Sequence, residues 1–586
     1  MPAKSLLPLA AVAGVAIAAS FVLFHRPTPS LRGEPGAAVA KSAAAARAPS
    51  SAAPPVSTAF RGPELSNSAA YIPAQCYAKT RDPDGKTTHN GCFVCHQASR
   101  VPNYVDDGDV QSELSFARYA THNRWNNFLQ PPPPAKEPNA ELLAWVRTSN
   151  YFEADGGITL AQRLAKPPPG WDTNHDGAWN GFVPDAWFHF DAQGFDVDAA
   201  GHFSGWRAFA SLPTPGMFMP TNGSAGDALI RLPEPFRKDA QGREDPAIYR
   251  VNLAIVEAFI RRVDVPIDKT DERALGSDLD GNGALGSATH VAFVWPPRPG
   301  RPFHYVGKAA ELDPQQEGWP VAGLFPRGTE FLHSVRYLDV VNGKVSMAAR
   351  MKELRYMRKL RWLNYGQLDQ SAQAEAREKH KNPDKLKQIF PSRERGVTTG
   401  VGWIMQGFIE DASGNLRPQS DEETTACIGC HGGIGATTDA TFTFARKLPA
   451  GAFQEGWYHP SQHGLEGTRD PKRADGSREY ARYLQAVGGA DDFRSNDEAR
   501  AKFFRADGSL DPAMAQRLAR DITLLLLPSP ERALALDRAY LGLVRAQRFE
   551  TGRDITVGSR PQVETQVTQD APTGVTKPVL PSWKRP

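Results

Sequence analysis

The sequence predicts a multidomain, loop-rich α+β protein. The chain has 586 residues, more than one ordinary hydrophobic core accommodates, so about two to four domains are expected. Its 49 prolines and 51 glycines indicate many loops. Hydrophobic residues make up 40% of the chain and charged residues 23%, as in globular rather than disordered proteins. Segments of alternating polarity and segments of helical periodicity both occur, which favours a mixed fold.

Strand and helix patterns are unevenly distributed. The stretch "DAWFHFDAQGFDVDAAG", residues 185–201, alternates in polarity around Gln193-Gly194 and predicts a β-hairpin. Residues 245–263 predict an amphipathic helix. Residues 347–367 predict another, since apolar side chains recur at helical spacing and the cations between them form a solvated face or bind haem propionates. The middle of the chain is therefore mixed, and residues 331–550 are expected to be mainly helical.

The N-terminal residues predict export. Lys4 precedes an apolar run from Leu6 to Phe24, which suits either a signal peptide or a single membrane anchor within residues 1–26. No cysteine lies near the end of this run to accept a lipid. Residues 27–60 are rich in Ala, Pro and Ser and predict a linker, and residues 551–586 predict a flexible tail. The net charge of +3 and the lack of a long basic run argue against nucleic acid as a partner.

Four of the five cysteines belong to two copies of one motif, in which two thiols lie three positions apart and histidine follows directly. On one helical turn, two such thiols can each bond a vinyl group of one haem while the histidine ligates its iron. The residues are Cys92, Cys95, His96, Cys427, Cys430 and His431. Cys76 belongs to neither motif and is expected to be buried near the first haem.

Two other chemistries use cysteine pairs. A zinc site would combine both pairs into one tetrahedron, but the pairs are far apart in sequence and zinc does not require both to end in histidine. A thioredoxin-like redox pair explains the thiols, but not the repeated histidine, and it needs a βαβ context. Because cysteines of exported proteins are usually paired or covalently occupied, covalent haem accounts best for both motifs.

With these two motifs and an export signal, the chain resembles a di-haem c-type cytochrome. The resemblance implies haem attachment through the four motif cysteines, with His96 and His431 as proximal iron ligands. It also implies a periplasmic location. Di-haem peroxidases place their two motifs much closer together than this chain does. The predicted domains are thus a first haem c region at 61–150, a mixed middle segment at 151–330, and a mainly helical second haem c region at 331–550.

The second axial ligand of each iron decides between a closed and an open haem. For the first haem we expect His122, in "FARYATHNRWNNFL", rather than His89, which lies in a polar loop. For the second we expect His333, in the apolar stretch "TEFLHSVRYLDVV", although a core histidine satisfied by a backbone carbonyl fits equally well. Thioether alternatives, which otherwise fill the core, are Met217, Met219 and Met405.

Two loops of the middle segment resemble the first half of a calcium-binding loop. Oxygen-bearing side chains at alternate positions precede a glycine, which permits a sharp turn around a hard cation. Both loops lack the glutamate that usually closes such a site at position twelve, where Val183 and Thr289 stand. They are either structural calcium loops or plain turns. The candidate ligands are Asp172, Asn174, Asp176, Asp278, Asp280 and Asn282.

Together these patterns predict an exported di-haem cytochrome c that transfers electrons to a periplasmic or membrane redox partner, with two haem c groups and calcium as cofactors. The alternative is a di-haem oxidoreductase, peroxidase- or oxygenase-like, with one open distal site. The length of the chain favours something beyond wrapping two haems, and a binding module that carries haem is a third class. Whether the protein is an enzyme stays open.

Overall fold

The computed structural model describes residues 65–80, 92–96, 101–102, 112–208, 223–314, 318–433, 437–441, 459–473, 475–491, 494–558 and 562–574. The predicted signal or anchor segment, the linker, His89, Met217 and Met219 lie outside these ranges, as does part of the predicted tail.

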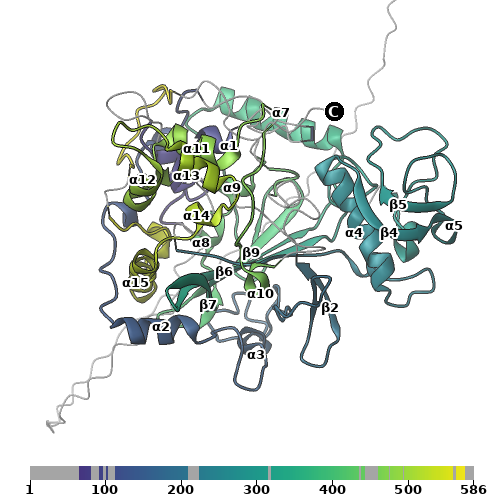
Figure 1. The fold of residues 1–586 in the computed structure, drawn as a ribbon, viewed down its shortest axis with the longest axis horizontal. Helices are drawn as coiled ribbons and strands as arrows, with labels where there is room; N and C mark the ends of the chain where they lie inside the picture. Colours follow the sequence, from purple (N-terminus) through teal and green to yellow (C-terminus); the bar gives the residue numbers. More distant parts are fainter. Residues whose placement is uncertain are drawn as a thin grey trace, which may run out of the picture. The chain divides into compact units, whose positions relative to one another are not determined.

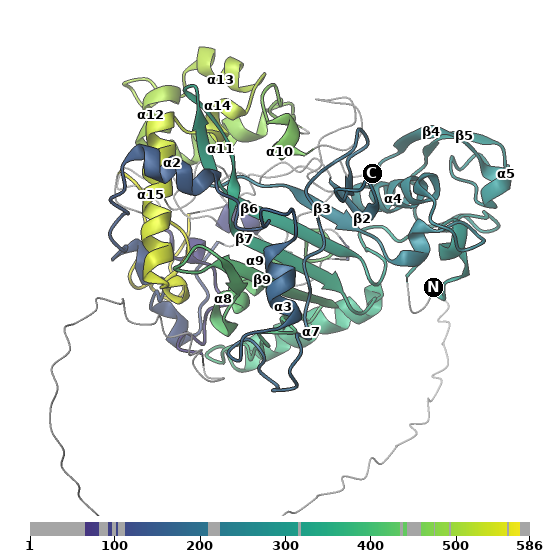
Figure 2. The ribbon, with the colours of Figure 1, turned by 90° about the horizontal axis from the view of Figure 1, so that it is seen from below.

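An eight-stranded antiparallel sheet forms the centre of the fold (Figure 2). Its strands follow the order β1-β2-β3-β6-β7-β9-β10, and β8 pairs with β9. The bounds are β1 Phe195–Val197, β2 Phe203–Ala208, β3 Ala228–Arg231, β6 Glu330–Val341, β7 Lys344–Lys359, β8 Val397–Thr398, β9 Trp403–Glu410 and β10 Leu416–Pro418. The predicted fold class, with mainly helical regions flanking a mixed segment, is therefore wrong, because residues 330–418 supply the longest strands of this sheet.

A tight turn joins the two longest strands, β6 and β7. Val341 pairs with Lys344, which leaves Asn342 and Gly343 as a two-residue connection with φ angles of 51° and 74°. Both angles lie in the left-handed region, which Asn-Gly adopts readily and which matches the twist of the flanking strands. The Asn-Gly pair therefore predicts a hairpin at this position, whereas the apolar spacing of the residues that follow it predicts a helix.

The predicted helix over 347–367 is wrong, since most of it is strand β7. The apolar residues of this strand face both ways: Met351 and Leu354 pack into the cluster on one face of the sheet, and Met357 into the cluster on the other. A register irregularity in the β6–β7 pairing lies close to Met351. Because both faces are buried, the period of two that identifies a half-buried strand is lost.

The cations of β7 are also placed differently from the expected solvated face. Arg350, Lys352 and Lys359 are all buried, with exposed fractions of 6%, 1% and 1%. Two of them form ion pairs, Arg350 with Glu410 and Lys359 with Asp439. A solvated basic face is therefore wrong for these three residues, and the strand carries charge into the core instead.

Each face of the sheet has its own hydrophobic cluster. Phe331, Met357 and Met405 pack on one face with α4 (Pro246–Arg261) and with Ile428 of the second motif. The opposite face packs against the segment from Tyr151 to Trp206. Helices α2 (Asn139–Arg147) and α15 (Pro530–Ala546) lie beside the β6–β7 hairpin, as Figure 2 shows. The sheet is thus buried on both sides.

Helix α4 confirms the predicted helix at 245–263. Asp245 caps it by accepting hydrogen bonds from the backbone N–H groups of Ala247 and Ile248, and Pro246 occupies its first turn, where no N–H is needed. The chain leaves the helix at Arg262, which has a left-handed conformation. The predicted hairpin at 185–201 is also present, since Phe190 bridges Asp196 in antiparallel pairing.

Apart from α7, which has 17 residues, the remaining helices of the described ranges are short. Strands β4 (Val265–Asp271) and β5 (Ser287–Val291) form a small sheet that lies beside α4 in both views (Figure 1), and β11 (Ala490–Asp491) pairs with β12 (Arg494–Ser495). The other helices are α1 Cys92–Cys95, α3 Thr159–Ala165, α5 Glu272–Leu275, α7 Tyr365–Lys381, α8 Asp421–Thr425, α9 Ile428–His431, α10 Pro460–His463, α11 Glu479–Val487, α12 Asp497–Phe503, α13 Pro512–Leu518 and α14 Thr523–Leu526. Single 3₁₀ turns are η1 Ala74–Tyr77, η2 Arg118–Thr121, η3 Asn126–Phe128, η5 Glu234–Arg237, η6 Gly307–Glu311 and η7 Phe549–Thr551.

Candidate functional site

Both cysteine motifs adopt the same local structure, one turn of helix that ends at the histidine. In the first, the His96 N–H donates to the carbonyl of Cys92 at 2.7 Å, and in the second the His431 N–H donates to the carbonyl of Cys427 at 3.1 Å. A helical turn places residues i and i+3 on one side. The two thiols of each motif therefore share a side of their turn, as the sequence predicts.

The fold brings the two motifs together although more than three hundred residues separate them. Cys76 lies near both: the pKa of its thiol is raised by burial and then by the neighbouring Cys92, and Cys76 in turn contributes to the raised pKa of Cys430. Gly429, inside the second motif, packs so closely on Tyr71 and Pro73 that a Cβ there would meet backbone at 2.4 Å. The two motifs and Cys76 therefore form one site, the Cys-His site.

A buried ion pair supports the histidine of the second motif. The His431 Nδ1 donates to the carbonyl of Ala440 at 2.9 Å, because a carbonyl can only accept. The preceding residue, Asp439, pairs with Lys359 at the end of β7 and accepts a hydrogen bond from the backbone N–H of Phe325. The sheet therefore fixes the ring orientation and the tautomer of His431, with the proton on Nδ1.

His333 on β6 lies close to His431. It is paired with Arg355 of β7 across the sheet, and His431 contributes to the lowering of its pKa. Burial is the main cause that lowers the pKa of His333 to about 3, and that of His431 to about 4. Both imidazoles are therefore neutral at pH 7, which is the form that binds metals.

Two partly buried arginines flank the second motif. Arg355 and Arg553 both pair with Glu353, through contacts of 2.9 and 2.8 Å, and both lie near Cys427. Burial acts to raise the pKa of Glu353, but the two cations outweigh it and hold this pKa at about 2. Two guanidinium groups share one carboxylate, so Glu353 balances only one of the two positive charges. The other positive charge would attract an anionic group at this site.

The thiols of the second motif are not activated. Burial is the largest cause that raises the pKa of Cys427, and it raises that of Cys430 to about 12. Reactive thiols of redox proteins have lowered pKa values, since the thiolate is the nucleophile. Among the described residues, the group of three ligand atoms within 4.8 Å is Glu272, Asp278 and Asp280, and no cysteines form such a group. These observations argue against both a thiol redox pair and a zinc tetrahedron.

The other predicted iron ligands lie elsewhere. His122 ends η2, is exposed, and forms an antiparallel bridge with Gln566. Met405 is 4% exposed and packs in the cluster that contains Phe331 and Met357. The structure therefore brings His333 to the Cys-His site, places His122 at the surface, and gives Met405 a place in the core.

The two predicted calcium loops differ in how their carboxylates are satisfied. Asp172 accepts hydrogen bonds from the N–H groups of Asp176 and Gly177 through its two oxygens, so the first loop closes on itself. Asn174 and Asp176 lie in the same loop, hydrogen-bonded to each other at 3.0 Å. In the second loop Asp278 and Asp280 gather with Glu272, which lies before them in the sequence. Asn282 is exposed and donates to Asp280.

Sequence reasoning missed several residues of these sites. Asp439 and Ala440 carry no motif, and only the ion pair to Lys359 reveals their positions. Arg355 is one of the cations of 347–367, for which the sequence left a solvated face and haem propionates open, and its pairing with His333 places it at this site. Glu272 was not predicted, because the carboxylate that closes a calcium-binding loop usually follows the loop, whereas Glu272 precedes it.

Comparison with known proteins identifies the family. A model of a lipoprotein family matches residues 60–519, so the chain belongs to that family. An uncharacterized lipoprotein of Aquifex aeolicus (strain VF5) is 31% identical over 534 residues, which cover 83% of this chain and 85% of the relative. No solved structure matches the chain.

The family assignment corrects the function predicted from the motifs. The resemblance to a di-haem c-type cytochrome is contradicted, because both the family and the relative are lipoproteins rather than cytochromes. The predictions of electron transfer and of a haem-dependent oxidoreductase are wrong on the same ground. Export is borne out, since a member of a lipoprotein family is an exported, membrane-associated protein. Among the described residues, none of the helices combines the length and apolarity needed to cross a membrane.

The buried pairing of Glu353 gives stability a specific pH dependence. The pKa of Glu353 is about 2 in the folded protein against 4.5 ordinarily, so its contribution is complete above pH 4.5 and is lost as the pH falls toward 2. We expect Glu353→Gln to lower the free energy of unfolding by about 3 kcal/mol at pH 7, with the deficit shrinking below pH 4.5. Urea-induced unfolding at a series of pH values measures this.

Glu311→Gln is the matched control. Glu311 pairs with Lys308 at the surface, so its substitution should change the free energy of unfolding by less than about 1 kcal/mol at any pH. A deficit for Glu353→Gln that stays constant from pH 7 to pH 2 would mean that this side chain acts through packing and not through its charge.

Proposed function

We propose that this exported member of a lipoprotein family binds haem covalently at its two cysteine motifs. Electron transfer, which the family assignment does not support, is not proposed. The observation that carries the proposal is the hydrogen bond from His431 Nδ1 to the carbonyl of Ala440. It holds a neutral imidazole in a fixed orientation beside two thiols on the same helical turn, and this is the arrangement that a covalently attached haem requires.

The residues of the Cys-His site fit such a group. Each motif thiol adds across one vinyl group, with sulfur bonding one carbon and hydrogen the other, so no oxidant or leaving group is needed. Raised thiol pKa values suit this role, because these cysteines need not ionise in the folded protein. Bound haem would supply an iron that side chains of the protein can ligate. His96 and His431 would be its ligands in their respective motifs.

The surroundings of the second motif extend this fit. Arg355 and Arg553 share one carboxylate between them, so they suit the anionic propionates that a haem brings into a buried site. His333 comes from the sheet face that the second motif packs against, and it is neutral and near His431. We assign it as the second axial ligand there, while His122 remains the ligand predicted for the first motif.

The finer localisation follows from the sequence. We propose a periplasmic protein held at the inner membrane by the apolar run from Leu6 to Phe24. Lipoproteins are ordinarily held by a lipid on a cysteine, but no cysteine lies near the end of the apolar run, and Cys76 is partly buried in the fold beside Cys92. The apolar run has the length of a marginal membrane span and therefore substitutes for the lipid.

Haem content tests the proposal directly. The full chain, produced in a bacterium that attaches haem to exported proteins, should carry two covalent haems by pyridine haemochrome assay and intact mass. Replacing Cys427 and Cys430 with serine should remove one haem, and replacing Cys92 and Cys95 should remove the other. Cys76→Ser is the control and should keep both, because Cys76 lies outside the motifs.

Two results would contradict covalent haem. One is a folded wild-type chain without any covalent haem from such a host. The other is stoichiometric zinc that disappears in the cysteine variants, Cys76→Ser included, which would make the Cys-His site a metal–thiolate centre.

The assignment of His333 has a spectroscopic test. His333→Leu should leave covalent haem content unchanged and convert one low-spin ferric signal to high spin in low-temperature EPR, since one iron loses an axial ligand. The same readout on His122→Leu tests the ligand predicted for the first motif. His189→Leu, at another exposed histidine, is the control and should leave the spectrum unaltered. Two unchanged low-spin signals in His333→Leu would exclude His333 as a ligand.

Membrane attachment can be measured by fractionation. Replacing residues 1–26 with a cleavable signal peptide should move the protein from the membrane to the soluble periplasmic fraction, because the apolar run is the proposed anchor. Metabolic labelling with radioactive palmitate should leave the full chain unlabelled. Labelled protein, or membrane attachment that survives the replacement, would show that something other than the apolar run holds it.

A further inference from the structure

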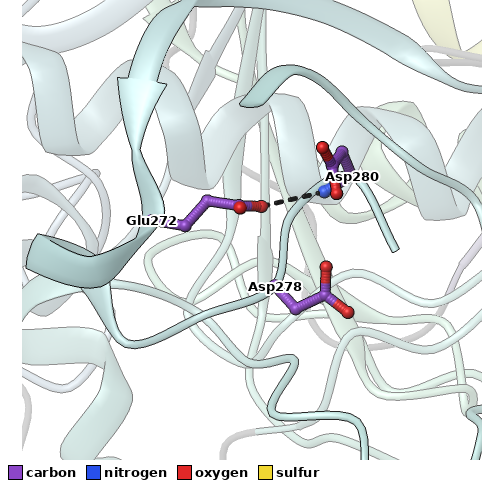
Figure 3. A group of neighbouring side chains, drawn as sticks. All are labelled: Glu272, Asp278 and Asp280. Atoms are coloured by element: carbon purple, nitrogen blue, oxygen red, sulfur yellow. Dashed lines mark hydrogen bonds between the residues drawn. The ribbon is translucent and has the colours of Figure 1, made fainter. Parts of the chain in front are cut away.

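Three carboxylates meet between β4 and β5, on the loop-rich side of α4 (Figure 3). Glu272 begins α5, and Asp278 and Asp280 follow in the loop that returns to β5. One ligand atom from each lies within 4.8 Å of the other two. Two oxygens on opposite sides of a calcium ion are also about 4.8 Å apart, since each Ca–O distance is about 2.4 Å. The spacing therefore admits an ion among the three.

Burial makes one oxygen of this cluster costly without a cation, whereas the Glu272 carboxylate accepts hydrogen bonds from the backbone N–H groups of Leu279, Asp280 and Gly286. Glu272 and Asp278 are both fully buried, with no exposed surface, and Asp280 is partly buried. Asp278 Oδ1 is buried, and no donor among the described residues reaches it. An ionised carboxylate oxygen without a partner in the interior is strongly unfavourable. This oxygen belongs to Asp278, one of the three residues of the cluster.

The cation that pairs with the cluster among the described residues, Arg301, does not fill this gap. Arg301 approaches the other oxygen of Asp278, with its Nε 3.3 Å from Oδ2, and its position is fixed by a hydrogen bond to the carbonyl of Asp278 and by stacking on Phe303. Three carboxylates and one guanidinium leave a net charge of −2. A divalent cation balances this charge.

We infer that Glu272, Asp278 and Asp280 form a calcium site, with Glu272 acting as the closing carboxylate that the loop itself lacks. The loop has the expected order of ligands, since Asp278, Asp280 and Asn282 stand at alternate positions before Gly283. Gly283 has a φ of 90° and donates its N–H to Asp278 Oδ2, which wraps the loop around the cluster. Glu272 reaches it from outside the loop.

The donor set selects the metal. All three side chains offer oxygen, which hard cations prefer, and there is no nitrogen or thiolate in the group that would favour zinc. Magnesium demands a near-ideal octahedron at about 2.0–2.1 Å and usually keeps several waters. Calcium accepts an irregular arrangement of protein oxygens, which suits ligands drawn from a loop and from the residue that begins α5.

The other calcium-like loop serves as an internal comparison. There Asp172 has both oxygens satisfied by backbone N–H groups of its own loop, and Glu394 accepts hydrogen bonds from Thr173. That loop is a self-contained turn, whereas the loop at 278–283 leaves an oxygen to be satisfied. The inference therefore applies to the second loop.

Calcium binding by the full chain tests the inference. After treatment with a chelator and its removal, isothermal titration with CaCl₂ should show saturable binding, and calcium should raise the unfolding temperature. Asp280→Asn should weaken the affinity at least tenfold, because it removes one charge while keeping an oxygen that can accept from Asn282. Asn282→Ala, at an exposed position, provides a second variant if the first folds poorly, and it should also weaken binding.

Asp268→Asn is the matched control. Asp268 lies on β4 with 84% of its side chain exposed, so calcium affinity should be unchanged. Absence of saturable binding up to about 10 mM, beyond the range of weak extracellular calcium modules, would overturn the inference. Unaltered calcium affinity in both Asp280→Asn and Asn282→Ala would also overturn the inference. Loss of binding in Asp176→Asn alone would place the ion in the first loop and refute the assignment to Glu272. Magnesium binding as tight as that of calcium would refute the choice of metal.

Discussion

The buried ion pair between Lys359 and Asp439 connects the second cysteine motif to the central sheet. Both side chains are almost fully buried, with exposed fractions of 1% and 4%, so neither charge has water to replace its partner. Removing one partner of such a pair is far more costly than the pair's net contribution. Because Asp439 precedes the residue whose carbonyl orients His431, the histidine keeps its geometry only while this pair is intact.

Strand β7 places charged side chains in the interior of the fold along its whole length. Glu353, Arg355, Met357 and Lys359 alternate along one face, so ionic and apolar groups reach the second motif from a single strand. A strand held on both sides by β6 and β9 is rigid enough to fix charged groups precisely. The Cys-His site is therefore built against regular structure, although its cysteines lie on short helical turns.

The sequence identified what depends on local spacing and missed what depends on tertiary pairing. Helix α4 was predictable because its cap and its periodicity are both local. The cysteine motifs were predictable because their spacing is local too. Strand β7 was not predictable, because burial on both faces and a register irregularity gave its sequence a helical pattern. The Asn342-Gly343 turn was the local signal that contradicted the helix. Asp439 is positioned by Lys359 of the distant strand β7 and Glu272 precedes its loop, so no spacing rule could reveal either residue.

The packing of the chain's early residues has a consequence for the order of folding. Residues 77–79 pair with residues 562–564, through hydrogen bonds of 2.8 Å from Lys79 to Gln562 and from Glu564 to Tyr77. A contact of this sequence separation is slow to form and requires nearly the whole chain. During export the early segment emerges first and its partner last. The cysteines next to it therefore remain accessible to other factors throughout translocation, and become enclosed only when the chain is almost complete.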